Sequence, residues 1–439
     1  MSQSVSEMVN TIVVRLEPEL QAIRRDIHAH PELGWEEFRT TSIVATWLRD
    51  LGYEVLVGQA VCDPATRMGV PSDEILQASF ERALAEGADP ELMEQMRGGY
   101  TGVVATLRNG EGPVVGMRFD IDALPMQETD SPEHRPNQEG FASTHPQVMH
   151  ACCHDVHTTI GMGVARIMME LRDSWSGTLR LVFQPAEEGV RGAKSMVSAG
   201  HLDDVQYLLS AHVEPGGQEG AHIHAGSGGT FATTKFLAYF HGKAAHAAGN
   251  PENGRNCVLA IATAALNISA MPRHSKGTSR INVGRIQAGS GANIIADYGE
   301  MELEVRGATT EINTYLADYT IRILESAAAM HGVTVDIEVA GESPSLESDD
   351  ALMEHVASSA EEVGVIAGLP HRFPMNASDD YAFMCQRVQE NGGQATYMQL
   401  MSPITRGMHT VVTDVDEQCL PRGLRVFVAS ALRLMPPQS

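Results

Sequence analysis

The order of predicted strands and helices between residues 232 and 339 constrains the fold more than any other feature of this sequence. The pattern predicts, in order, a strand at Ala232 to Tyr239, a helix at Arg255 to Met271, strands at Ser279 to Gln287 and Gly299 to Val305, a helix at Thr310 to His331, and a strand at Val333 to Val339. This strand-helix-strand-strand-helix-strand order is the ferredoxin-like pattern. The Gly-rich segment Gly226 to Gly229 just before it is typical of a hinge. We therefore expect a small α+β domain over residues 230–340, inserted into a larger domain.

The rest of the chain alternates strands with helices. Strands are predicted at Gly102 to Leu107, Val114 to Phe119, Thr178 to Phe183, Gln206 to His212 and Ala395 to Leu400. This alternation indicates an α/β domain with a mixed sheet, built from residues 1–229 and 341–439. A polar stretch, Gly58 to Gly99, reads as a surface insertion with two short helices. A length of 439 residues agrees with two domains.

The segment His150 to His157 carries two thiols, three imidazoles and a carboxylate. A thiolate and an imidazole two residues apart are ligands that zinc- or manganese-type sites use. Residues two apart point to different sides of a helix, so Cys152 and His154 can share an ion only from a loop or strand end. Helical periodicity begins at His157, which places the pair just before a helix. A buried structural thiol in a polar loop is the alternative explanation.

Further candidate ligands lie at predicted strand ends. Pro185 ends one strand and is followed by Glu187 and Glu188, at the edge where open α/β sheets bind ligands. One carboxylate could bind metal while its neighbour acts as a general base. His212 closes another strand, and His409 stands alone in a loop before the C-terminal helix. Each motif by itself also fits an ordinary acidic turn or a core histidine, but together, in this order, they favour a metal site.

Composition excludes several classes of protein. The net charge of -25 argues against nucleic-acid and anionic-membrane partners, and it means that an acidic ligand needs a local cation. The six cysteines lack the spacing of a disulfide framework, and no apolar run has the length of a signal peptide core or a membrane span. A reduced, cytoplasmic, soluble protein is expected.

Four motifs resemble, in this order, those of the di-metal aminoacylase/carboxypeptidase superfamily. They are His150 to His157, Gln184 to Glu188, the strand-end His212 and the loop His409. The similarity is to the superfamily's branch of hippurate hydrolases and auxin–amino-acid amidohydrolases, and an Asp-x-Asp-Ala-Leu-Pro segment at Asp120 to Pro125 matches as well. The resemblance covers nearly the whole chain. It implies a metallopeptidase-like catalytic domain with an inserted lid domain that mediates dimerisation.

The resemblance also implies a role for each matching residue. Two divalent ions, manganese or zinc, would be held by Cys152, His154, Glu188, His212 and His409, with Cys152 bridging them. Glu187 would be the general base, and Asp122 and Asp155 would orient ligand imidazoles. His157 is either another such supporting residue or simply part of the helix start. In the inserted domain, His246 would stabilise the oxyanion in a partner's active site, and Asn293 and Arg306 would bind the substrate carboxylate. Without the resemblance, Asn293 fits a solvated loop equally well and Arg306 a surface salt bridge.

One departure from the family pattern stands beside the metal ligands. The family has Gly between the ligand Cys and His, whereas this chain has Cys153. Gly at such a place usually reflects tight packing or a positive φ. Cys153 would therefore crowd the loop, compete as a ligand, form a vicinal disulfide with Cys152 under oxidation, or simply be tolerated.

The insertion Gly58 to Gly99, together with Phe38 to Thr40 and Ala232 to Phe236, resembles the long form of the branch. These members cleave p-aminobenzoyl-glutamate, with a homologous B subunit as partner, or indole-3-acetyl-aspartate. The sequence does not show whether the substrate is p-aminobenzoyl-glutamate or indole-3-acetyl-aspartate. A broader N-acyl-amino-acid amidohydrolase is a third possibility. Two further interpretations are an inactive metal-binding partner subunit, which an intact Glu187 disfavours, and a thiol-redox protein, which the absence of a Cys-x-x-Cys motif disfavours.

Overall fold

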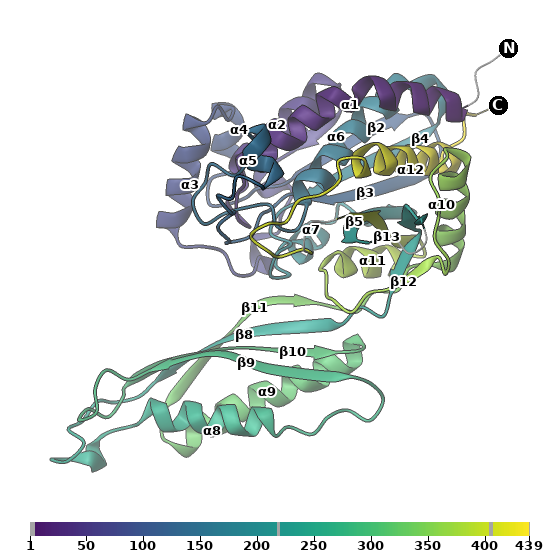
Figure 1. Cartoon of the computed structure of the whole chain (residues 1–439). Helices are drawn as coiled ribbons and strands as arrows, with labels where there is room; N and C mark the ends of the chain where they lie inside the picture. Colours follow the sequence, from purple (N-terminus) through teal and green to yellow (C-terminus); the bar gives the residue numbers. More distant parts are fainter. Residues whose placement is uncertain (1–4, 217–219, 404–406, 439) are drawn as a thin grey trace.

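The computed structural model describes residues 5–216, 220–403 and 407–438. They form a large α/β unit around a seven-stranded sheet and a smaller unit with a four-stranded sheet and two helices (Figure 1). The mixed α/β architecture predicted from the sequence is confirmed. Among the described helices, none combines the length and the apolar character needed to cross a membrane.

The large sheet is mixed. In sheet order its strands are β1 (Glu54–Leu56), β2 (Val103–Asn109), β4 (Gly177–Gln184), β3 (Val114–Asp120), β5 (Tyr207–Pro215), β13 (Gln394–Ser402) and β6 (Ile223–His224). The inner strands β4, β3, β5 and β13 run parallel, and the outer strands join antiparallel. Because parallel strands are covered on both faces, they are buried almost continuously, and their carboxyl ends lie at one edge. A separate pair is formed by β7 (Gly226–Gly228) and β12 (Arg372–Pro374).

Helices cover both faces of this sheet. One apolar core contains residues of α1 (Val5–Ala29), α2 (Phe38–Asp50), α6 (His154–Glu170), α10 (Asp350–Glu362) and α12 (Cys419–Leu434). The core on the other face contains residues of α7 (Ala193–Ser198) and α11 (Tyr381–Glu390). A short helix, α5 (Arg135–Glu139), lies in the long connection between β3 and α6.

The insertion at residues 58–99 contains the two predicted short helices, α3 (Asp73–Ala85) and α4 (Pro90–Gln95). It packs firmly against the large unit. The Arg67 guanidinium lies over the rings of Trp35 and Tyr100, 4.5 and 4.1 Å from their centroids. Arg67 also donates a hydrogen bond to the Gly98 carbonyl. The insertion is therefore packed against the large unit and is part of it.

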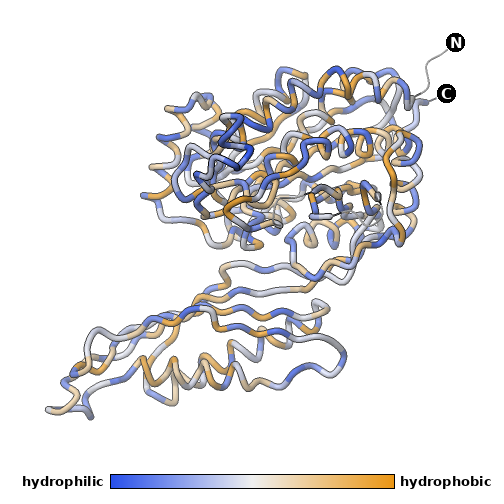
Figure 2. Tube along the Cα trace, viewed as in Figure 1, coloured by the Kyte–Doolittle hydropathy of each residue, from blue (hydrophilic) through white to orange (hydrophobic). Residues whose placement is uncertain are grey.

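The smaller unit, here called the lid, has the predicted order of elements. They are β8 (Ala232–His241), α8 (Cys257–Ser269), β9 (Ser279–Ala288), β10 (Tyr298–Gly307), α9 (Thr310–Met330) and β11 (Thr334–Ser343). The antiparallel sheet has the order β11-β8-β10-β9, and its strands alternate hydrophobic with hydrophilic residues (Figure 2). Both helices cover one face, away from the large unit (Figure 1), and pack on buried side chains such as Phe236 and Phe240.

The two ends of the lid meet. The Leu346 N–H donates to the Thr230 hydroxyl at 2.5 Å, and that hydroxyl lies 3.3 Å from the Leu346 carbonyl oxygen. The chain thus enters and leaves the lid at neighbouring points. The last lid strand extends to Ser343, three residues beyond the predicted boundary at residue 340.

Candidate metal centre

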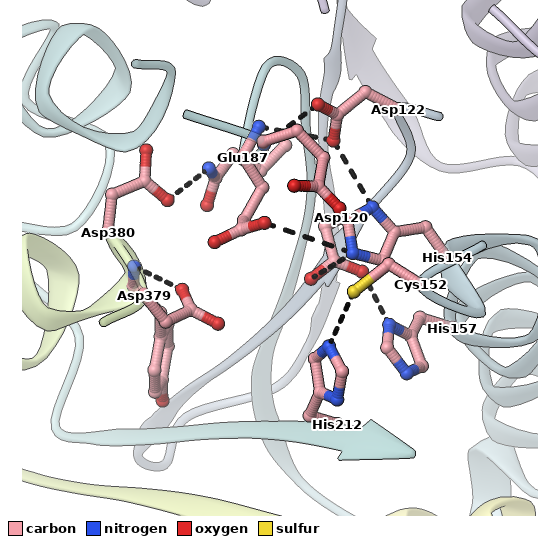
Figure 3. Close-up of polar contacts among 12 residues, drawn as sticks. Asp120, Asp122, Cys152, His154, His157, Glu187, His212, Asp379 and Asp380 are labelled. Carbon is pink, nitrogen blue, oxygen red and sulfur yellow. Dashed lines mark hydrogen bonds and ion pairs between the residues drawn. The ribbon is translucent and has the colours of Figure 1, made fainter. Parts of the chain in front are cut away.

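The turn before α6 brings Cys152 and His154 to the same side. Cys153, with φ +67°, is the N-cap of α6, and His154 is the first helical residue. The left-handed conformation of Cys153 reverses the chain, so the sulfur of Cys152 and the ring of His154 converge (Figure 3). The prediction that both lie before the helix is therefore wrong for His154, because the helix starts three residues earlier than the periodicity indicates.

The sulfur of Cys152 is the centre of the cluster. It lies 3.4 Å from Nε2 of His212 and 3.2 Å from Nε2 of His409 in the C-terminal loop. His212 does not close its strand, as the sequence predicts, but lies within β5, because pairing with β13 continues to Pro215. The potential ligand atoms of Cys152, His154 and His212 all lie within 4.8 Å of one another, and so do those of Cys152, Glu188 and His409. The structure thus brings the five predicted ligands together as two groups that share one sulfur.

Two buried atoms in the cluster lack a hydrogen-bond partner among the described residues, namely Nε2 of His154 and Oε1 of Glu188. Asp122 lies 3.2 Å from Nδ1 of His154, and the Val213 carbonyl lies 2.8 Å from Nδ1 of His212. Each acceptor favours a proton on Nδ1, which leaves the Nε2 lone pair facing the cluster. Imidazoles held in this way, a thiolate and a carboxylate fit zinc or manganese, and cations would satisfy the unpartnered atoms.

Asp122 also fixes the acidic turn after β4. Its carboxylate accepts the backbone N–H groups of Glu187 at 3.1 Å and Glu188 at 2.9 Å. Oε2 of Glu187 lies 3.9 Å from Nε2 of His154. Burial, followed by the negative charge of Asp379, raises the pKa of Glu187 well above its usual value. This carboxylate is therefore placed beside the cluster and is a better proton acceptor than an exposed one.

The two remaining supporting candidates differ from each other. His157, the fourth residue of α6, places Nδ1 2.5 Å from Asp120, and its Nε2 accepts the Val213 N–H at 2.9 Å. Burial lowers the pKa of His157 to about 4, so the ring is neutral and positions its neighbours. The prediction for Asp155 needs correction. Its carboxylate faces Arg24 at 2.7 Å and His28 at 2.8 Å, so the imidazole that it orients belongs to α1.

A buried ion-pair network behind the acidic turn was not predicted. Arg118, fully buried on β3, contacts Asp120 at 2.7 Å and Asp379 at 3.2 Å. Asp379 in turn lies beside Glu187. The only sequence signals were the first Asp of the Asp-x-Asp motif and the acidic pair Asp379-Asp380, because the contacts join segments far apart in the chain.

Two cavities adjoin the cluster. One, of about 230 Å³, is lined by Glu187, Glu188, His409 and the lid residues Lys235 and Arg306, among others. The other, of about 640 Å³, shares Glu188, His409 and the two lid cations, and adds Pro71 and Ile75 from the insertion.

The other two lid candidates stay apart from the cluster. His246 and Asn293 are exposed and line neither cavity. They lie close to each other, because the Ala247 N–H donates to the Asn293 carbonyl and His246 forms a β-bridge with Ile294. One chain therefore brings Arg306 to the cavity beside the predicted ligands, but not His246 or Asn293.

Comparisons with known proteins show the family to which the chain belongs. Residues 116–433 match the family described as Peptidase family M20/M25/M40. The chain is 41% identical to a p-aminobenzoyl-glutamate hydrolase subunit of Escherichia coli K12 and 40% identical to the indole-3-acetyl-aspartic acid hydrolase of Enterobacter agglomerans, with 97% of this chain and 98% of each relative covered.

Solved structures are similar over nearly the full length. An aminobenzoyl-glutamate utilization protein from Klebsiella pneumoniae superposes with a TM-score of 0.84 at 35% identity, covering 97% of this chain and 98% of the other. A dinuclear metal-binding peptidase of Bacillus subtilis superposes with a TM-score of 0.66 at 25% identity, covering 96% and 99%.

Proposed function

Because the chain belongs to the M20/M25/M40 family of peptidases and is a metal-dependent amidohydrolase, we propose that its substrate is an N-acyl amino acid with an aromatic acyl group. The preferred candidate is p-aminobenzoyl-glutamate, which hydrolysis converts to p-aminobenzoate and glutamate. Indole-3-acetyl-aspartate is the alternative, and a broader range of N-acyl amino acids is a third. The names of the two relatives support the first two equally, since the identities differ by one percentage point.

The observation that carries the proposal is the sulfur of Cys152, shared by two groups of ligand atoms. We propose that Cys152, His154, Glu188, His212 and His409 hold two ions, manganese or zinc, with Cys152 bridging them. When bound, such ions polarise the scissile carbonyl and lower the pKa of water at the site.

Glu187 is the proposed general base. It would accept a proton from the attacking water at Oε2 and then return it to the nitrogen of the leaving amino acid. Its backbone is fixed by Asp122, and its buried carboxylate faces His154 at 3.9 Å. The buried network of Arg118 and Asp379 supports it from behind.

Substrate binding would involve the lid. Arg306 is the proposed partner of the α-carboxylate, with Asn293 as a second contact. For His246, Nδ1 accepts the N–H groups of Ala248 and Gly249, which leaves an Nε2–H to donate to an oxyanion. Because His246 and Asn293 lie away from the cluster in one chain, we propose that a second copy supplies them in a homodimer. A heteromer with a homologous B subunit is the other arrangement, supported by the name of the Escherichia coli relative, which is one subunit of its enzyme.

A proposal of another class is an inactive metal-binding partner subunit. Glu187 beside the metal ligands argues against it, since a partner without activity needs no base there.

The test is release of the free amino acid from p-aminobenzoyl-glutamate, indole-3-acetyl-aspartate, hippurate and N-acetyl amino acids, with manganese or zinc added to the purified protein. We expect one acidic conjugate to be preferred. Glu187→Gln should lower kcat by about 10²–10⁴-fold while the bound metal is retained. Turnover of none of these substrates by a metal-loaded protein would favour the inactive subunit or a missing partner.

A further inference from the structure

Two cations share one face of the lid sheet. In the antiparallel pairing of β8 with β10, Lys235 is opposite Glu304 and Thr233 is opposite Arg306. Because side chains alternate along a strand, and Phe236 belongs to the lid core, Lys235 lies on the face away from the lid helices. Lys235 and Arg306 are therefore diagonal neighbours, with backbones roughly 7–8 Å apart. Their long side chains can approach each other more closely.

This face borders the metal cluster. Lys235 and Arg306 are the only lysine or arginine side chains among the described residues that line the smaller cavity, whereas Glu187, Glu188, Glu214 and Asp379 are its acidic residues. Five of the six proposed ligands and base line this cavity, all except His154, so the two cations are what remains to hold an anionic substrate. In a chain of net charge -25, such a local pair is required for an acidic ligand.

The two cations differ in their partners. The guanidinium of Arg306 donates to both carboxylate oxygens of Glu304, each at 3.0 Å, and lies 3.4 Å from the Ser378 hydroxyl. For Lys235, no carboxylate within the described part of the chain lies close enough to form an ion pair. Burial lowers the pKa of the Lys235 ammonium, and the charge of Glu304 offsets this only in part. An incoming carboxylate would therefore stabilise this partly desolvated ammonium, and it would not have to displace a carboxylate of the protein.

We propose that Lys235 binds the side-chain carboxylate of the leaving amino acid and thereby selects N-acyl glutamates and aspartates over conjugates of neutral amino acids. This inference rests on the proposed function, in which Arg306 holds the α-carboxylate. Lys235 is a specificity-determining residue in this arrangement.

A third cation near the site, Arg191, hydrogen-bonds to the backbone. Arg191 lines only the larger cavity, and its guanidinium donates to the carbonyls of Glu188 and Gly69, both at 2.9 Å. Its donors join the acidic turn to the insertion. The Arg191 guanidinium is thus held by backbone acceptors, whereas the Lys235 ammonium has neither a hydrogen bond nor an ion pair among the described residues.

The experiment uses the full-length protein loaded with manganese or zinc and two conjugates with the same acyl group, p-aminobenzoyl-glutamate and p-aminobenzoyl-glutamine. In Lys235→Met, we expect kcat/KM for the glutamate conjugate to fall about 10–100-fold, mainly through KM, because one charge-assisted contact is lost. The glutamine conjugate should change by less than about threefold, and Lys235→Arg should keep most of the preference. Lys276→Met, which removes a charge from an exposed lid ion pair, is the matched control and should change neither.

An equal fall for both conjugates, or no change for either, overturns the proposal. A second measurement needs no variant. Glutarate, a dicarboxylate, should inhibit the wild-type protein at least about tenfold more strongly than butyrate, and equal inhibition would also contradict the proposal. Failure of the proposed function is separately visible, because the wild-type protein would then hydrolyse neither conjugate.

Discussion

Nε2 of His409 lies 3.2 Å from Sγ of Cys152, although 257 residues separate them. The backbone N–H of His409 also donates to the Ala151 carbonyl at 2.9 Å. The loop before the last helix is thus fastened to the turn before α6 by its backbone as well as by its side chain. The position of one proposed ligand is therefore set by that of another.

The shared sulfur should control the binding of both ions. Burial, and then the charges of Glu188 and Glu187, raise the pKa of the Cys152 thiol well above its usual value, so bound cations must stabilise the thiolate. We expect Cys152→Ser to weaken binding of both ions by at least about 10-fold, as measured by equilibrium dialysis with metal analysis. Cys257→Ser, at a buried lid cysteine, is the control. Loss of only one ion would show that the sulfur does not bridge.

Replacement of Cys153 should leave the site active. Its φ of +67° costs a residue with a Cβ about 1–2 kcal/mol, which Gly would avoid, whereas Gly would lose a buried side chain. We expect Cys153→Gly to change the free energy of unfolding by less than about 1 kcal/mol, to retain or raise activity, and to slow inactivation by an oxidant.

Cys153→Ala separates the effect of losing the thiol from the effect of releasing the strained backbone. Ala lacks the thiol but has a Cβ, so the strain at positive φ is kept. The main charged neighbour of the Cys153 thiol is Asp155, not one of the proposed ligands. Complete loss of bound metal in Cys153→Gly would nevertheless show that Cys153 is a ligand.

Mixing two inactive variants tests the proposed homodimer. If each site combines Glu187 of one copy with His246 of the other, Glu187→Gln and His246→Ala will each abolish most activity. Mixed dimers of the two would contain one intact site. After subunit exchange at equal concentrations, about a quarter of the wild-type activity should return. If the mixture has only the summed activity of the separate variants, His246 does not act across a dimer.

Acid should weaken the contact between α1 and the loop before α12. Although burial alone would raise it, hydrogen bonds from Arg25 and Gln21 lower the pKa of Glu417 to about 2. A carboxylate with a lowered pKa stabilises the fold above its ordinary pKa, and this stabilisation is lost as the pH falls from about 5 to 2.

We expect Glu417→Gln to lower the free energy of unfolding at pH 7 by about 2–3 kcal/mol, and to flatten its dependence on pH between 5 and 2. Denaturant unfolding at a series of pH values checks this. Glu19→Gln, at an exposed position of α1, serves as the control and should follow the wild type.

Local patterns predicted most of the fold. The lid elements have strong periodicity, and the inner strands of the large sheet are apolar runs. The bounds of both were therefore predicted to within a few residues. The strands β6, β7 and β12 were missed because each has only two or three residues and exists through pairing with distant segments. The proposed ligands Cys152, His154 and Glu188 could be predicted from the sequence because each lies at or close to the end of a regular element.

Contacts across the fold could not be predicted in the same way. Lys235 reads in the sequence as one polar position of an alternating strand, and only the pairing of β8 with β10 reveals its neighbour Arg306. The role of Asp155 was misjudged for the same reason, since nothing in its surrounding sequence indicates that Arg24 and His28 face it.

The meeting of the lid's two ends at Thr230 and Leu346 has an evolutionary consequence. A segment that leaves and rejoins its host at one point can be exchanged as a cassette without breaking the host sheet. The proposed ligands and base lie on the host, and Lys235 and Arg306 lie on the cassette. If Lys235 and Arg306 bind the amino-acid part of the substrate, as proposed, reaction chemistry and amino-acid preference can be inherited separately.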